Sequence, residues 1–292
     1  MTRTAIGIDL GGTNVRICLL SADGRRLRDH FAAVPRADSA AHLIEHLAQL
    51  VRQVQGDATP TGIGLGVAGA LDAQDCLLAG MTNLPVLAGV PLATALGDLA
   101  SLPVLIDNDA RVAMRGEARF GGARACRNAL LVTLGTGIGS GLLLDGQVRQ
   151  GPNRLAGELG LALESDPTAA AGWIALEDVA SPGGLKRTRG LDLAQTIGLA
   201  AAGDDAAARD VDHVCTRLAV AIVNAQVLLD LEAVLLSGGA AVSLLAGIRG
   251  AYARLCPPAF QGKLAIEMAA LGEWAGAVGA AALWFEGPGN TP

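Results

Sequence analysis

Aromatic and charged residues are scarce in this sequence. Aromatic residues make up 3% of its 292 residues and charged residues 17%, whereas hydrophobic residues make up 51% and glycine occurs 39 times. Small side chains must therefore fill much of the core, and many backbone positions can turn tightly. The net charge of -6 leaves no basic excess, so we expect no nucleic acid as a partner. A chain of this length fits two domains of ordinary size.

Cysteine pairs, a targeting segment and a membrane span are missing as well. The five cysteines are Cys18, Cys76, Cys126, Cys215 and Cys256, and no two form a CxxC pair. Such an odd, dispersed set is typical of reduced thiols rather than of disulfides or a zinc site. Asp9 interrupts the apolar start before a signal-like run develops, and no uncharged apolar run approaches the roughly 20 residues of a spanning helix. We expect a cytoplasmic protein that does not bind a membrane.

The hydrophobic pattern predicts an α/β protein with an internal repeat. Apolar runs bounded by turn residues predict strands at residues 4–9, 15–20, 25–33, 62–69, 104–107, 129–133, 140–144 and 233–236. Helical spacing predicts helices at residues 40–55, capped by Ser39, and at 91–100, 110–119, 206–229 and 272–285. The segments IDLGGTNVRICLLSADG and VTLGTGIGSGLLLDG both consist of strand, glycine turn, strand and Asp-Gly turn. Two such copies predict two similar lobes that face each other.

The glycine turns of the two copies are candidate phosphate-binding loops, because backbone N–H groups and a hydroxyl can surround an anion there. The first turn consists of Gly11, Gly12, Thr13 and Asn14. Thr136 and Gly137 offer the same groups in the second copy, and Gly238 and Gly239 follow a third strand where a nucleotide can approach the backbone. The GxxxxGK[ST] motif is absent. Each loop alone would also fit an ordinary hairpin, so the hypothesis depends on the pair.

Two aspartates that follow apolar strands are candidates for the chemistry. Asp9 ends the first strand, where a carboxylate can hold Mg²⁺ through water; a hydrogen bond to the turn backbone is the alternative. Asp109, in IDNDA, stands where a strand gives way to a helix. Transfer of a phosphoryl group from ATP to an alcohol needs an acceptor for the hydroxyl proton, which a positioned aspartate can be. The alternative for Asp109 is an N-cap, and one residue can play both roles.

Four further polar residues are candidates for sugar binding. Vicinal hydroxyls suit bidentate acceptance by carboxylates, and amides add both a donor and an acceptor. The candidates are Glu158 in AGELG, Glu177 in LEDVAS, Asn83 and Asn108. Taken singly, each glutamate fits a surface or capping position better than a ligand site, so these assignments depend on additional information.

Seven motifs occur in a fixed order along nearly the whole chain. They are IGIDLGGTNVR, GIGLGVAG, TNLPVLAGVPL, LPVLIDNDARVAMRGE, LLVTLGTGIGSGLLLDGQVRQGPNRLAGELG, ALEDVASPGGL and VLLSGGAAV. This ordered set resembles the ROK family of repressors, uncharacterised reading frames and sugar kinases, although short pieces such as GGT or GTG carry no specificity alone.

The resemblance implies an actin-like ATPase fold, with duplicated ribonuclease-H-like α/β lobes and ATP bound in the cleft between them. The expected lobes are residues 1–115, completed by a C-terminal helix at 272–286, and residues 116–271. It implies Asp109 as the base for the sugar hydroxyl, and a homodimer. The implied sugar contacts are Gly69, Asn83, Asn108, Glu158 and Glu177. The implied phosphate loops contain Gly11, Gly12, Thr13, Thr136 and Gly137, with Gly238 and Gly239 on the adenosine side.

The sequence departs from the family pattern in four places. Leu161 stands where a histidine usually follows AGELG, and the usual cysteine-rich zinc motif is missing, since no Cys or His lies between Glu158 and Ser181. A structural zinc needs about four such ligands, so we expect no zinc. Ala68 replaces a usual proline, which is expected to cost only rigidity. Arg111 replaces a usual asparagine, and this change is expected to bear on the pocket.

The segment that replaces the zinc loop must be held by other contacts. Trp173, Ile174 and Leu176 are expected to pack as a small apolar cluster in place of the metal.

The leading hypothesis is a glucokinase-like enzyme that uses ATP and Mg²⁺ to phosphorylate a hexose, with the 6-hydroxyl as the expected acceptor. A kinase for fructose or an N-acyl hexosamine and a non-catalytic sugar sensor are the alternatives. A transcription regulator would need a DNA-binding module before the strand at residue 4. A chaperone-like ATPase would need a peptide-binding domain.

Overall fold

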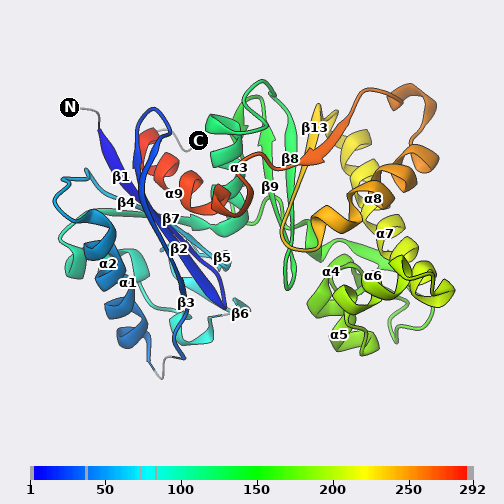
Figure 1. Cartoon of the computed structure of the whole chain (residues 1–292), viewed down its shortest axis with the longest axis horizontal. Helices are drawn as coiled ribbons and strands as arrows, with labels where there is room; N and C mark the ends of the chain where they lie inside the picture. The colour runs from blue at the N-terminus through cyan, green and yellow to red at the C-terminus, as the bar shows by residue number, and fades with distance from the viewer. Residues whose placement is uncertain (1–2, 37–38, 73, 83, 288–292) are drawn as a thin grey trace. The chain divides into compact units, whose positions relative to one another are not determined.

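The structure, a computed structural model, describes residues 3–36, 39–72, 74–82 and 84–287. Its contacts divide the chain into two units, one containing Met1–Arg124, Val148–Ala156 and Glu273–Pro292, the other Ala125–Gln147 and Gly157–Gly272 (Figure 1). The two largest differences from the predicted lobe ranges lie at residues 116–124 and 148–156. The break falls after Arg124, because the turn after the helix that carries Asp109 is bonded back to Glu117. Residues 148–156 join the first unit, to which Gln150 and Arg154 donate hydrogen bonds.

Each unit contains a five-stranded sheet, and the strand order is the same in both. The first sheet has the order β3-β2-β1-β4-β7 and the second β10-β9-β8-β13-β14. The first contains β1 (Thr4–Leu10), β2 (Asn14–Ser21), β3 (Arg26–Ala33), β4 (Ile63–Val67) and β7 (Val104–Asn108). The second contains β8 (Ala129–Leu134), β9 (Ile138–Leu144), β10 (Gln147–Val148), β13 (Ala233–Ser237) and β14 (Ala265–Met268).

The pairing directions repeat as well. β1 pairs antiparallel with β2 and parallel with β4, just as β8 pairs antiparallel with β9 and parallel with β13. The parallel part then extends to β7 in the first sheet and to β14 in the second. The internal repeat predicted from the sequence is therefore confirmed, and it is the duplicated ribonuclease-H-like topology of the actin-like ATPase fold.

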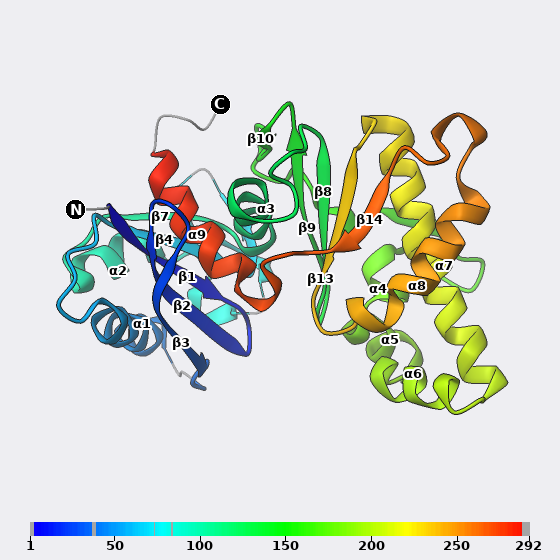
Figure 2. The same cartoon turned by 45° about the horizontal axis from the view of Figure 1, so that its top comes forward.

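Helices cover both faces of the first sheet (Figure 2). They are α1 (Ala40–Gln55), α2 (Leu92–Ala100), α3 (Asp109–Phe120) and α9 (Ala275–Glu286). Ser39 caps α1 as predicted, accepting the N–H of His42. Ile6 and Ile8 share a buried cluster with the apolar face of α1, whereas Gly7 faces Ala277 of α9. Since neighbouring strand residues point to opposite faces, α1 and α9 lie on opposite sides of β1.

The second unit has its own apolar core. Its helices are α4 (Leu176–Ala180), α5 (Pro182–Arg189), α6 (Leu193–Ala201), α7 (Asp205–Leu229) and α8 (Ala241–Leu255). Single-turn 3-10 helices occur at Pro85–Leu87 in the first unit, at Leu159–Leu161 and Pro258–Phe260 in the second, and at Gly272–Trp274, where the chain passes from the second unit to the first. Among the described residues, α7 alone meets the length and composition expected of a membrane span. Its buried residues, including Val214, Leu218 and Ile222, pack in this core.

A two-stranded hairpin lies in the segment between Glu158 and Ser181, where the sequence predicts no zinc loop. Its strands are β11 (Leu163–Ser165) and β12 (Trp173–Ala175), which pair antiparallel. Glu164 accepts a hydrogen bond from Arg217 of α7 at 2.6 Å. Leu176 is buried as predicted, but Trp173 is 58% exposed, so the predicted apolar cluster is wrong for Trp173. The strand ladder and the Glu164–Arg217 ion pair hold the hairpin without that side chain.

Candidate functional site

The first candidate site lies in the first unit, at the carboxyl ends of parallel strands. The register aligns Asp9 of β1 with Gly66 of β4, and Gly66 with Asp107 of β7. Asp109 follows β7 as the first residue of α3. Because the ends of parallel strands meet at one edge of a sheet, this topology brings Asp9 and Asp109 together. Gly66 has no side chain between them, and an added Cβ would lie 3.5 Å from the Asp109 Cα.

Asp9 lies in a confined environment. Its carboxylate packs against Gly276 of α9, where an added Cβ would overlap it. Burial and then the nearby Asp109 carboxylate raise the pKa of Asp9 from 3.8 to about 7, while Arg16 opposes the rise. Near neutral pH this carboxyl group is therefore divided between its protonated and ionised forms, and a bound cation would favour the ionised form.

We expect the raised pKa of Asp9 to make stability depend on pH. Between about pH 4 and about pH 7 the folded protein keeps a proton that the unfolded chain has lost, so the free energy of unfolding falls as pH rises through this window. A cation held by this carboxylate would favour its ionised form, so Mg²⁺ is expected to oppose that fall. Thermal unfolding across the window, with EDTA or with Mg²⁺, measures both effects.

Two variants isolate the contribution of Asp9. Asp9→Asn should flatten the pH dependence and remove the Mg²⁺ effect. Asp57→Asn, at a side chain that is 88% exposed, should retain both. Superimposable pH profiles for the parent and Asp9→Asn would contradict the assignment.

The turn after β1 is a tight glycine hairpin beside Asp9. The N–H of Gly11 donates to the carbonyl of Asn14 at 3.0 Å. Gly12 and Thr13, at the tip of this turn, are exposed. The turn therefore leaves backbone and hydroxyl groups accessible next to a carboxylate, an arrangement that suits a metal-bound phosphate.

Asn108 rather than Asp109 caps α3. Its side-chain oxygen accepts the N–H groups of Ala110 and Arg111 at 3.0 and 3.1 Å. Its Nδ2 donates to the carbonyl of Gly69 at 3.1 Å, which ties β7 to the hairpin of β5 (Gly69–Leu71) and β6 (Leu77–Thr82). Of the alternatives for Asp109, the N-cap role thus belongs to its neighbour. Asn83 lies outside the described residues.

In the second unit, the turn between β8 and β9 mirrors the first one. Gly135 N–H donates to the carbonyl of Gly137 at 3.1 Å, and Thr136 is exposed at the tip. Glu177 lies against this turn, where its Oε2 accepts the N–H of Ile138 at 2.8 Å. An added Cβ at Gly137 would overlap the Glu177 carboxylate. One oxygen of Glu177 is therefore committed to shaping the loop.

The two residues that flank Glu158 are both hydrogen-bonded to Ser140. The Ser140 hydroxyl donates to the carbonyl of Gly157 and accepts the N–H of Leu159. Gly157 has a φ of +90°, a backbone conformation that favours glycine. Leu161, at the position of the expected histidine, is 54% exposed.

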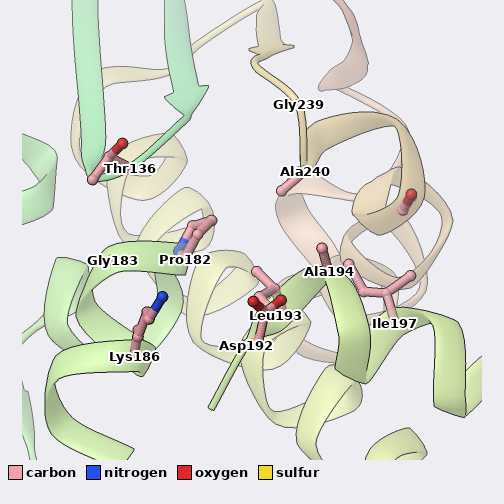
Figure 3. Close-up of a pocket in the computed structure, with 11 residues that line it drawn as sticks. Thr136, Pro182, Gly183, Lys186, Asp192, Leu193, Ala194, Ile197, Gly239 and Ala240 are labelled. Carbon is pink, nitrogen blue, oxygen red and sulfur yellow. The ribbon is translucent and has the colours of Figure 1, made fainter. Parts of the chain in front are cut away.

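A cavity of about 480 Å³ lies within the second unit (Figure 3). Three helices begin at its wall: Pro182 opens α5, Leu193 opens α6, and Ala240 immediately precedes α8. Helix N-termini carry unpaired N–H groups and partial positive charge, so they attract anions. The cavity also has one basic and one acidic side chain in its lining, Lys186 and Asp192.

Predicted and unpredicted residues meet in this cavity. Thr136 and Gly239 line it, and Gly238, with a φ of +95°, turns the chain from β13 toward α8. Lys186 and Asp192 were not predicted. The sequence held one signal for Lys186, because it is one of only two lysines and follows the helix start SPGG.

The acidic residues also bear on metal binding. Among the described residues, no group of three or more Asp, Glu, His or Cys could hold a metal ion. The Asp9 carboxylate supplies hard oxygen donors, which fits Mg²⁺, because this ion is held by one or two carboxylates together with waters and substrate phosphates.

Residues 5–286 match the model of the ROK family. An N-acetylmannosamine kinase from Citrobacter koseri is 30% identical over 290 residues, covering 96% of this chain and 98% of that protein. A glucokinase from Halalkalibacterium halodurans is 28% identical over 309 residues, covering 95% and 93%. A ROK family glucokinase from Streptomyces griseus, solved with glucose and AMPPNP, is 25% identical with a TM-score of 0.78, covering 96% and 98%.

Proposed function

Because the chain belongs to the ROK family, we propose that it is a sugar kinase that transfers the γ-phosphoryl group of ATP to a hexose hydroxyl. The observation that carries the proposal is the placement of Asp109 beside Asp9 at the edge of the first sheet. A carboxylate that accepts a proton and a carboxylate that suits Mg²⁺ are the two groups such a transfer needs at its centre.

Asp109 acts as the general base in this proposal. It accepts the proton of the attacking hydroxyl while the sugar oxygen bonds to the γ-phosphorus and the bond from that phosphorus to the bridging β–γ oxygen breaks, releasing ADP. Asp9 would hold Mg²⁺, which supplies positive charge to the phosphate oxygens when it is bound. The turn from Gly11 to Asn14 in the first unit, and the turn at Thr136 and Gly137 in the second, are each proposed to offer backbone N–H groups to phosphate.

The cavity of the second unit is the proposed nucleotide site. Its three helix N-termini favour the phosphates, and Gly239, where an added Cβ would meet nothing within 4 Å, leaves the backbone open to the adenosine. Gly238 supports this opening by packing its backbone against Leu134. The Streptomyces griseus relative was solved with AMPPNP, an ATP analogue, which supports ATP as the donor.

Lys186 offers a direct test of this nucleotide site. Lys186→Ala should raise the KM for ATP about 10-fold, the loss expected for a charged contact, with the KM for sugar unchanged. A dialdehyde derivative of ATP should label the Lys186 amine, as read by peptide mass spectrometry, and ATP should protect it. Lys263, the only other lysine, is exposed and serves as the unprotected control. Equal labelling of both lysines, with or without ATP, would place the nucleotide elsewhere.

The proposed sugar contacts are Gly69, Asn83, Asn108, Glu158 and Glu177. For Asn108, its oxygen already accepts two backbone N–H groups, so its remaining amide hydrogen is the group left for a hydroxyl. Glucose, phosphorylated at the 6-hydroxyl, is the leading substrate, and an N-acyl hexosamine is the second candidate because relatives carry both activities in their names.

Measuring ADP release across a panel of hexoses and N-acyl hexosamines tests the function. We expect saturable, Mg²⁺-dependent turnover with at least one sugar. No turnover with any sugar, at protein concentrations that bind ATP, would overturn the proposal in favour of a sugar sensor. We further propose a cytoplasmic homodimer without zinc.

A further inference from the structure

A fully buried arginine lies two residues after the proposed base. The Arg111 side chain, in the first turn of α3, is 1% exposed. Its Nε donates to Oδ1 of Asp107 at 2.7 Å, and its Nη1 donates to the carbonyl of Arg154 at 2.9 Å. One planar guanidinium therefore joins the end of β7 to the segment 148–156. A lysine would join them less well, because its ammonium is a point charge on a flexible side chain.

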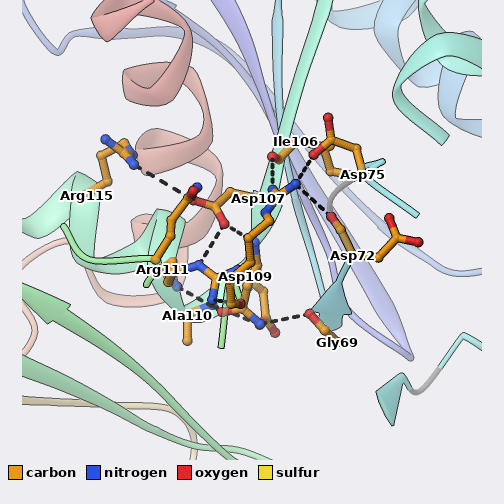
Figure 4. Close-up of polar contacts among 12 residues, drawn as sticks. Gly69, Asp72, Asp75, Ile106, Asp107, Asp109, Ala110, Arg111 and Arg115 are labelled. Atoms are coloured by element: carbon orange, nitrogen blue, oxygen red, sulfur yellow. Dashed lines mark hydrogen bonds and ion pairs between the residues drawn. The ribbon is translucent and has the colours of Figure 1, made fainter. Parts of the chain in front are cut away.

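Asp107 is the acceptor at the centre of this arrangement (Figure 4). Its carboxylate is fully buried. Oδ1 accepts the N–H of Asn108 at 2.8 Å as well as Arg111, and Oδ2 accepts from Gln150 at 2.9 Å. These bonds fix the turn from which Asn108 and Asp109 project.

Arg154 extends the connection to a third segment. It has a φ of +57°, which is unusual for a residue other than glycine. Its Nη1 donates to the carbonyl of Asp72 at 3.1 Å and to the Asp75 carboxylate, and its Nη2 donates to the carbonyl of Ile106 at 3.3 Å. The hairpin of β5 and β6 is thereby tied to β7 and to the segment 148–156.

Each joined segment leads to a proposed sugar contact. The turn after β7 carries Asn108 and Asp109, the β5–β6 hairpin begins at Gly69 and precedes Asn83, and the segment 148–156 ends two residues before Glu158. We propose that Arg111 and Arg154 are positioning residues that hold these segments in register for sugar binding. The inference rests on the sugar kinase function proposed above.

The decisive measurement compares the KM for the sugar with the KM for ATP in Arg111→Met. Misplaced recognition groups should lower kcat/KM for the sugar about 10- to 100-fold, mainly through KM, with the KM for ATP within about twofold. Methylguanidinium should partly restore the sugar KM of Arg111→Ala, because it can occupy the space left by the side chain. Arg154→Gly, which suits the positive φ, should raise the sugar KM in the same way.

Arg115→Met is the matched control. Arg115 is also a buried arginine of α3, but it pairs with Glu286 and approaches Asp107 only at 3.8 Å. It should lower stability while leaving the sugar KM unchanged. Where Arg111→Met does not fold, Asp107→Asn/Arg111→Gln removes both charges, avoids an unpaired buried carboxylate, and should still show the raised sugar KM.

Failure of the inference and of the proposed function are distinguishable. A parent protein that turns over sugar, with Arg111 variants of equal sugar KM, would overturn the positioning role alone. A parent without turnover would overturn the kinase. Amide hydrogen exchange then tests positioning by itself: Arg111→Met, unlike Arg115→Met, should speed exchange in residues 148–156, and unchanged exchange there would refute it.

Discussion

Asp109→Asn is expected to abolish phosphoryl transfer while sugar binding persists. Asparagine keeps the size of aspartate and can still accept the N–H of Ala110, which the Asp109 carboxylate accepts at 2.8 Å. It cannot take the proton of the attacking hydroxyl. General-base catalysis contributes about 10²- to 10⁴-fold, so kcat should fall by at least about 100-fold. The dissociation constant of the sugar, measured by calorimetry, should change by no more than about threefold.

The same substitution elsewhere in the unit controls for the loss of a negative charge. Asp57→Asn changes an exposed residue paired with Arg28, and it should retain the parent kcat. Parent-level turnover in Asp109→Asn would show that another group accepts the proton. Loss of turnover together with loss of sugar affinity would instead show that Asp109 mainly binds the sugar.

Gly279→Val is expected to have the largest effect on stability. At this position α9 touches α3 backbone to backbone, because an added Cβ would overlap the carbonyl of Val112. Gly116 meets the same contact from the α3 side, where an added Cβ would lie 2.7 Å from the carbonyl of Ala275. Valine would force the two helices apart, and no rotamer avoids a clash that begins at Cβ. We expect the free energy of unfolding to fall by more than about 4 kcal/mol.

Gly198→Ala is the matched control for this prediction. Gly198 lies inside α6, and an added Cβ there would have no neighbour within 4 Å. Alanine should raise the free energy of unfolding by up to about 1 kcal/mol, because it is the better helix former. Urea denaturation measures both variants. A midpoint for Gly279→Val equal to that of the parent would mean that the two helices do not depend on this close approach.

Long, strongly patterned elements could be predicted from the sequence. Ser39 marked the start of α1, and the apolar face of this helix is buried, at Leu43, Ile44, Leu47, Leu50, Val51 and Val54. The two glycine hairpins were predicted with nearly correct bounds, because an apolar run broken by glycine has few other readings. Two similar lobes were predicted from those hairpins, and the shared strand order confirms the repeat.

Short elements between residues 159 and 201 were not predicted. The strands β11 and β12 have three residues each, and α4 has five, which is too few for either periodicity to stand out. Tertiary contacts stabilise them instead, among them the Glu164–Arg217 ion pair and the bonds from Ser181 to the start of α5. The Lys186 side of the cavity was missed for the same reason.

The sequence by itself determined the duplicated α/β topology and the candidate loops, because hydrophobic period and glycine position act over a few neighbouring residues. Only the tertiary structure decided which distant groups meet. The register of β1, β4 and β7 brings Asp9 to Asp109, and burial there raises the pKa of Asp9 to about 7. The tertiary structure also shows that Asn108 caps α3 and that Arg111 bonds to Asp107 and Arg154. Contacts between residues far apart in the chain depend on how the elements pack, so the local sequence pattern does not predict them.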